Sequence, residues 1–125
     1  MMHAKAAMIL EDEPIVAFAL EDMLFELGVE EVQLATRIAE ARDHLERTTP
    51  DFAILDVNIH GERSYGIAEL LVKRGVPILF ATGYGDAEHP AALSHIPTLT
   101  KPYGRDDLQA ALSLLTCPDK SGILR

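Results

Sequence analysis

The sequence predicts an α/β protein with a doubly wound, five-stranded parallel sheet. Five short apolar segments alternate with segments of helical period along the 125 residues. The central segment, Phe52–Val57, is apolar without a helical period and follows a Thr-Thr-Pro break, which predicts a strand buried on both faces. Strands that alternate with helices in this way predict right-handed crossovers with helices on both faces of the sheet.

The first half of the chain supplies two strands and two helices before the central strand. Ala6–Leu10 predicts the first strand, and Pro14 suits the first turn of a helix that Gly28 caps. Val32–Ala35 predicts the second strand, and Thr36 is expected to cap the second helix. The apolar positions of these helices recur at helical spacing, at Val16, Leu20, Met23, Leu24 and Leu27, and then at Ile38, Ala41, Leu45 and Thr48.

The second half continues the alternation with less regular signals. Residues 58–64 predict a polar loop, followed by a third helix with Ile67, Leu70 and Leu71 on its apolar face. Val76–Thr82 predicts the fourth strand. Residues 86–95 are ambiguous, because one or two helical turns at Ala91–Leu93 are limited by Pro90.

The last strand and helix complete the predicted domain. Pro97–Thr100 predicts the fifth strand by its position in the alternation, and Asp106 or Asp107 opens the last helix. The buried face of that helix is expected to carry Leu108, Ala111, Leu112 and Leu115. We expect one domain over residues 1–125, with a core of about 5–116 and a loose tail at 117–125.

Composition narrows the class of protein. The net charge of −9 argues against nucleic-acid and anionic-membrane partners and suits a metal cation or a basic protein surface. Cys117 is the single cysteine, so no internal disulfide forms and a reducing compartment is indicated. No apolar run approaches the ~20 residues of a membrane helix. We therefore expect a cytoplasmic protein.

Functional side chains gather where the predicted strands end. Glu11 and Asp12 follow the first strand, Asp56 follows the apolar core of the third, and Thr82 and Lys101 follow the fourth and fifth. Because the carboxyl ends of parallel strands share one edge of the sheet, these groups are expected to converge.

Such a cluster has a definite chemistry. Three carboxylates repel one another unless a cation lies among them, and hard oxygen ligands suit Mg²⁺. The lysine offsets the charge of a carboxylate or phosphate, and the hydroxyl can donate to a phosphoryl oxygen. A carboxylate beside Mg²⁺ and lysine is a plausible nucleophile toward phosphorus.

The motifs resemble those of the receiver domain of two-component response regulators. They are Ile-Leu-Glu-Asp-Glu at 9–13, Ile-Leu-Asp-Val-Asn at 54–58, Ala-Thr-Gly at 81–83 and Lys-Pro at 101–102. Each motif alone is weak, but all four in order at strand ends are a strong match. The resemblance covers nearly the whole chain and implies a flavodoxin-like (βα)5 receiver fold.

The resemblance implies a role for each site residue. Asp56 would accept a phosphoryl group from a kinase histidine, and Thr82 and Lys101 would contact that group. Mg²⁺ would be held by Glu11, Asp12, Asp56 and the backbone carbonyl of Asn58.

A narrower likeness concerns residues 77–85, Pro-Ile-Leu-Phe-Ala-Thr-Gly-Tyr-Gly. This stretch resembles the signature of the FATGUY receivers, which are often stand-alone receivers or general stress regulators of alphaproteobacteria. That likeness implies a sensor histidine kinase of the HWE type, or a histidine phosphotransfer protein, as phosphodonor. An unknown downstream protein would receive the signal.

Two positions depart from the receiver pattern. The aromatic switch residue that many receivers carry three positions before the lysine is Thr98, and the usual proline four residues after the aspartate is His60. The usual coupling of threonine to an aromatic ring therefore cannot be assumed. Tyr84 and Tyr103 are the candidates to replace that ring.

We expect a stand-alone response regulator, not an enzyme. One alternative is a small Mg²⁺-dependent phosphatase with Asp56 as nucleophile, but the second aspartate that such enzymes usually want two residues later is Asn58. A second alternative is a receiver-like binding module that is never phosphorylated. The stretch from Gly83 to Pro97, rich in glycine and proline, is expected to be the least ordered part before phosphorylation.

Overall fold

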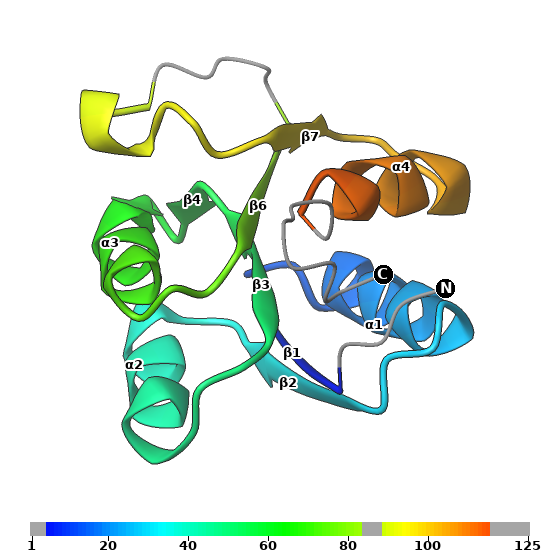
Figure 1. Cartoon of the computed structure of the whole chain (residues 1–125), viewed down its shortest axis with the longest axis horizontal. Helices are drawn as coiled ribbons and strands as arrows, with labels where there is room; N and C mark the ends of the chain where they lie inside the picture. Colours follow the sequence, from blue (N-terminus) through cyan, green and yellow to red (C-terminus); the bar gives the residue numbers. More distant parts are fainter. Residues whose placement is uncertain (1–4, 84–88, 116–125) are drawn as a thin grey trace.

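A five-stranded parallel sheet lies between two layers of helix in the computed structural model, which describes residues 5–83 and 89–115 (Figure 1). The strands follow the order β2-β1-β3-β6-β7, with every neighbouring pair parallel. Their bounds are Ala6–Leu10 for β1, Glu31–Ala35 for β2, Phe52–Asp56 for β3, Ile78–Thr82 for β6 and Thr98–Thr100 for β7. The predicted doubly wound sheet is therefore confirmed.

Helices cover both faces of this sheet. They are α1 (Pro14–Glu26), α2 (Ile38–Arg47), α3 (Tyr65–Lys73) and α4 (Arg105–Leu115). Figure 1 shows α1 and α4 on one face and α2 and α3 on the other. In the described part of the β6–β7 crossover, only the 3-10 turn η1 (Ala91–Leu93) takes the place of a helix, directly after Pro90.

The central strand is continuous in apolar residues because it serves two cores. Ala53 and Leu55 belong to the core under α2 and α3, whereas Phe52 and Ile54 belong to the core under α1 and α4. Side chains alternate between the two faces of a strand. A strand that is covered on both faces therefore has no solvent-facing positions for polar residues. This burial fixes the register of β3 and hence the position of Asp56 at its end.

Two helix starts differ from the sequence prediction. Thr36 is not the cap of α2, because the N-cap residue is Arg37. Instead the Glu40 carboxylate accepts hydrogen bonds from the Thr36 backbone N–H at 2.7 Å and its hydroxyl at 3.1 Å, which together hold the pKa of Glu40 below its ordinary value. Helix α4 begins at Arg105, one residue before the earlier of the two predicted starts.

Local structure appears where a loop was predicted. Residues 58–64 contain a short hairpin of β4 (Asn58–Ile59) and β5 (Glu62–Arg63). Its two central residues, His60 and Gly61, have φ of 51° and 85°, the left-handed region that a tight hairpin turn needs. Thr48 also differs from its prediction, since it is exposed at the end of α2 while Ala41 and Leu45 form the buried face.

Three expectations lie wholly or partly outside the described residues: the 117–125 tail with Cys117, the Tyr84 candidate, and the middle of the Gly83–Pro97 stretch. The part of that stretch from 89 to 97 contains Leu93 and Ile96, which are buried in the core under α3. Among the described helices, none has the length and apolarity needed to cross a membrane.

Candidate functional site

The strand order brings the predicted site residues to one edge of the sheet. Asp56 ends β3, which lies between β1 and β6, and Thr82 ends β6. Glu11 follows β1 directly, and Lys101 follows β7 directly. The backbone N–H of Lys101 donates to the Thr82 carbonyl at 2.8 Å, so the ends of β6 and β7 are tied together at the site.

Three carboxylates and one ammonium form the centre. Oxygens of Glu11, Asp12 and Asp56 lie within 4.8 Å of one another. Lys101 Nζ donates to Glu11 Oε1 at 2.7 Å and to Asp56 Oδ2 at 3.0 Å. Glu11 is only 2% exposed and Asp56 is 8% exposed, so the lysine neutralises charge that water reaches poorly.

Burial and ion pairing shift two pKa values at this centre. Burial raises the pKa of Glu11, with the nearby Asp56 charge adding to the rise and the Lys101 hydrogen bond opposing it. Burial alone would lower the pKa of Lys101, but its hydrogen bonds to Glu11 and Asp56 outweigh this effect and raise it. The site therefore pairs a charged lysine with carboxylates that repel one another.

Backbone and hydroxyl groups hold the acids in place. The backbone N–H of His60 donates to Asp12 Oδ2 at 2.9 Å, and that of Asn58 donates to Asp56 Oδ1 at 3.4 Å. Ser64 is fully buried and its hydroxyl donates to the Asp56 backbone carbonyl at 2.7 Å. The β4–β5 hairpin thus connects Asp12 to the chain that follows Asp56.

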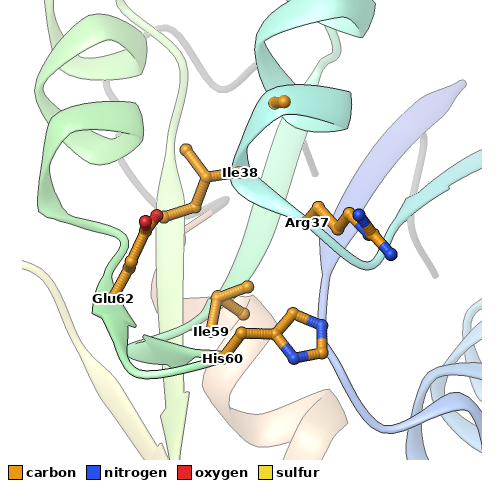
Figure 2. Close-up of a pocket in the computed structure, with 6 residues that line it drawn as sticks. Arg37, Ile38, Ile59, His60 and Glu62 are labelled. Carbon is orange, nitrogen blue, oxygen red and sulfur yellow. The ribbon is translucent and has the colours of Figure 1, made fainter.

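A shallow pocket of about 370 Å³ adjoins the hairpin. Figure 2 shows Ile38 and Ile59 between the Glu62 carboxylate on one side and Arg37 with the His60 imidazole on the other. His60 links this pocket to the acidic cluster, because it lines the pocket and its backbone N–H donates to Asp12 Oδ2.

Tyr103 does not take the place of the missing aromatic ring near Thr98. Its ring packs with the core under α1 and α4, on the other face of the sheet from Phe80 and Tyr65. The hydroxyl is buried without a hydrogen-bond partner among residues 5–83 and 89–115. Burial raises the pKa of Tyr103 to about 12.

The ring beside Thr98 belongs to His89, which is part of none of the sequence motifs. His89 Nε2 lies 3.2 Å from the Thr98 hydroxyl and His89 Nδ1 lies 3.1 Å from the Tyr65 hydroxyl. Its ring centroid is 4.5 Å from that of Phe80. No motif marks His89, and its Tyr65 partner lies 24 residues away in sequence. Ser64 belongs to no motif either.

The chain is similar to known proteins in sequence and in fold. Residues 7–113 match the family described as response regulator receiver domain. The chain belongs to this receiver family. It is 32% identical over 109 residues to the sensory transduction protein LytT of Bacillus subtilis, a match that covers 84% of this chain and 45% of LytT. The chain thus spans about half the length of that curated relative.

Two solved receivers are close in fold. The solution structure of SdrG from Sphingomonas melonis Fr1 is 38% identical, with a TM-score of 0.81 over 92% of this chain and 98% of SdrG. The receiver domain of the sensor histidine kinase PA1611 from Pseudomonas aeruginosa is 26% identical, with a TM-score of 0.76 over 89% of this chain and 96% of that domain. That structure has a magnesium ion coordinated in its active-site cleft.

The acidic cluster of this receiver fits a magnesium ion. Its ligands are hard carboxylate oxygens, which Mg²⁺ prefers, and their spacing lets Glu11, Asp12 and Asp56 reach one ion. Receivers bind Mg²⁺ at an acidic pocket of this kind. Such an ion would relieve the repulsion that burial imposes on the three carboxylates.

Proposed function

We propose that this receiver accepts a phosphoryl group on Asp56 from a histidine kinase and passes the signal on through a protein partner or by onward phosphotransfer. The observation that carries the proposal is the engagement of Asp56 by Lys101 at 3.0 Å inside a cluster of three carboxylates. A carboxylate held this way is neutralised on one oxygen, which leaves Oδ1 for chemistry. Among the described residues, Oδ1 accepts one hydrogen bond, the 3.4 Å bond from the Asn58 backbone N–H.

The proposed transfer is a displacement at phosphorus. An Asp56 carboxylate oxygen forms a bond to phosphorus, and the bond from phosphorus to the donor's imidazole nitrogen breaks. The donor ring enters with its second nitrogen already protonated, so it leaves as neutral imidazole. Lys101 exchanges one of its carboxylate contacts for a phosphoryl oxygen, and the Thr82 hydroxyl donates to another. No side chain has to supply a proton to the leaving group at neutral pH.

Glu11, Asp12, Asp56 and the Asn58 backbone carbonyl are the proposed Mg²⁺ ligands. The bound ion supplies charge neutralisation between the incoming phosphate and the acids. Asn58 begins β4, two residues beyond Asp56, and its N–H faces the same carboxylate. The raised pKa of Glu11 implies that acidification weakens this site by protonating that ligand.

A surface for the phosphodonor adjoins the site on α1. Ile15 and Phe18 follow the acidic cluster by a few residues and are 83% and 56% exposed, although both are large and apolar. Phe25 is 45% exposed on the same helix. A helical partner with an apolar face and basic flanks would match this surface in an acidic protein, as suits a histidine kinase of the HWE type or a histidine phosphotransfer protein.

We propose that residues 1–125 form a single receiver domain. The likeness to SdrG, which covers 98% of that chain, supports this proposal. We further propose that it does not turn over substrate as a phosphatase would, since Asn58 stands where a second aspartate would act. The proposed setting is the cytoplasm, where such kinases deliver their phosphoryl groups.

Incubation with acetyl phosphate and Mg²⁺ tests this function. We expect one stable phosphoryl group per chain, measured by intact mass. Continuous release of phosphate without accumulation of the labelled chain would support the phosphatase instead. Failure to label at all, with Mg²⁺ present, would support a binding module that is never phosphorylated.

A further inference from the structure

His89 joins three separate elements through its side chain. One ring nitrogen is hydrogen-bonded to Thr98 at the start of β7, and the other to Tyr65 at the start of α3. The ring lies against Phe80 of β6, and Tyr65 contacts Phe80 edge-on with centroids 5.9 Å apart. We call this group of His89, Tyr65, Phe80 and Thr98 the His89 cluster.

Two members of the cluster lie on β6, which ends in Thr82, and on β7, which Lys101 follows directly. Phe80 pairs with Thr98 across β6 and β7, and Thr82 pairs with Thr100 in the same ladder. Residues 83–88 lead directly from Thr82 to His89. Thr82 and Phe80 also share β6, so a shift of Thr82 toward a phosphoryl group acts on the strand against which the His89 ring packs.

The structure shows one arrangement of the acidic site together with one arrangement of the His89 cluster. While Lys101 Nζ binds Glu11 and Asp56, the His89 ring is seated on Phe80 with both nitrogens engaged. Both hydrogen bonds and the contacts of the His89 ring would be lost together if this side chain moved, because it makes all of them. Such a group is suited to two discrete arrangements.

We propose that His89 is a latch that stabilises the unphosphorylated arrangement, and that a phosphoryl group on Asp56 releases it. The proposal rests on the proposed phosphorylation of Asp56. Its physical basis is linkage: any contact made in only one of two arrangements shifts their populations by its own free energy. Release uncovers the Phe80 and Tyr65 rings beside β7, which gives the signal a surface that differs between the two states.

Binding of the phosphoryl mimic beryllofluoride in the presence of Mg²⁺ measures the latch. Weakening the latch must make the mimic bind more tightly, since less free energy is needed to leave the latched arrangement. We expect Thr98→Val, which removes one hydrogen bond, to tighten binding roughly fivefold. His89→Ala removes every contact of the ring and should tighten binding further.

His95→Ala is the matched control, because His95 is an exposed histidine of the same crossover outside the His89 cluster. It should bind the mimic as the parent chain does, by calorimetry under the same conditions. The latch is refuted if His89→Ala binds no more tightly than the parent, or no more tightly than His95→Ala. If the parent itself fails to bind the mimic with Mg²⁺, the proposed phosphorylation fails, and the latch fails with it.

Discussion

Substitution of Lys101 by methionine tests the electrostatics of the site most severely. The substitution keeps an unbranched chain but removes the ammonium that lies 2.7 Å from Glu11 and 3.0 Å from Asp56. It leaves three carboxylates whose oxygens lie within 4.8 Å of one another, of which Glu11 is 2% exposed. At an effective dielectric constant of about 20, two such charges repel by about 3.5 kcal/mol at that separation.

We therefore expect Lys101→Met to lower the free energy of unfolding by about 3 kcal/mol at neutral pH in EDTA. Protonation of Glu11, whose pKa is already raised, keeps the loss from growing larger. Millimolar Mg²⁺ should recover most of the loss, because the ion supplies the missing positive charge. Urea unfolding followed by circular dichroism, with and without Mg²⁺, measures both effects.

Lys73→Met is the matched control, because Lys73 is an exposed lysine in the last turn of α3. It should change stability little in either buffer. The double variant of Lys101→Met with Glu11→Gln should lose less than Lys101→Met alone, since one stranded charge is gone. The reasoning is wrong if Lys101→Met equals Lys73→Met in EDTA, or if Mg²⁺ gives it no more stability than it gives the parent.

Three further predictions concern single side chains of the site. Asp56→Asn should abolish labelling by acetyl phosphate while the thermal unfolding of the domain stays cooperative, because the amide is not a nucleophile. Asp12→Asn should gain about 1 kcal/mol in EDTA and lose Mg²⁺ binding, since it removes one clustered charge and keeps an acceptor for the His60 N–H. Tyr103→Phe should also gain about 1 kcal/mol, because it deletes a buried hydroxyl that has no partner among the described residues.

Tyr103 carries a pH signature as well. Its folded-state pKa of about 12 lies above the ordinary value of 10.0, so the neutral phenol contributes stability that is complete below pH 10 and is lost as the pH rises toward 12. Ultraviolet titration of phenolate should show one tyrosine that ionises late, and Tyr103→Phe should delete that step. Label on Asp56→Asn, lost stability in Asp12→Asn, or an unchanged titration in Tyr103→Phe would each contradict its prediction.

The sheet and its acidic edge could be predicted from the sequence because both depend on local patterns. A strand buried on both faces shows as a continuous apolar run, and Phe52–Asp56 is such a strand. Once the parallel order is known, residues that follow the strands must share one edge, which is why Glu11, Asp56 and Lys101 were found.

The features that the sequence did not predict arise from contacts that no motif or apolar period encodes. His89 meets Tyr65 across a separation of 24 residues, and neither residue belongs to a motif. The β4–β5 hairpin was predicted as loop because its strands are two residues long, too short for an alternating pattern. Threonine favours the N-cap position, which is why the sequence predicts Thr36 as the cap of α2. In the structure the Thr36 backbone N–H instead donates to the carboxylate of Glu40 in the first turn of that helix.

The site of phosphorylation is the central claim, and one chemical mapping experiment tests it directly. The chain is incubated with acetyl phosphate and Mg²⁺, the acyl phosphate is trapped by reduction with borohydride, and the modified residue is located by peptide mass spectrometry. The account predicts conversion of the residue at position 56 to homoserine, dependent on Mg²⁺ and absent from Asp56→Asn. Conversion at Glu11, Asp12 or another carboxylate, with Asp56 unmodified, would contradict it.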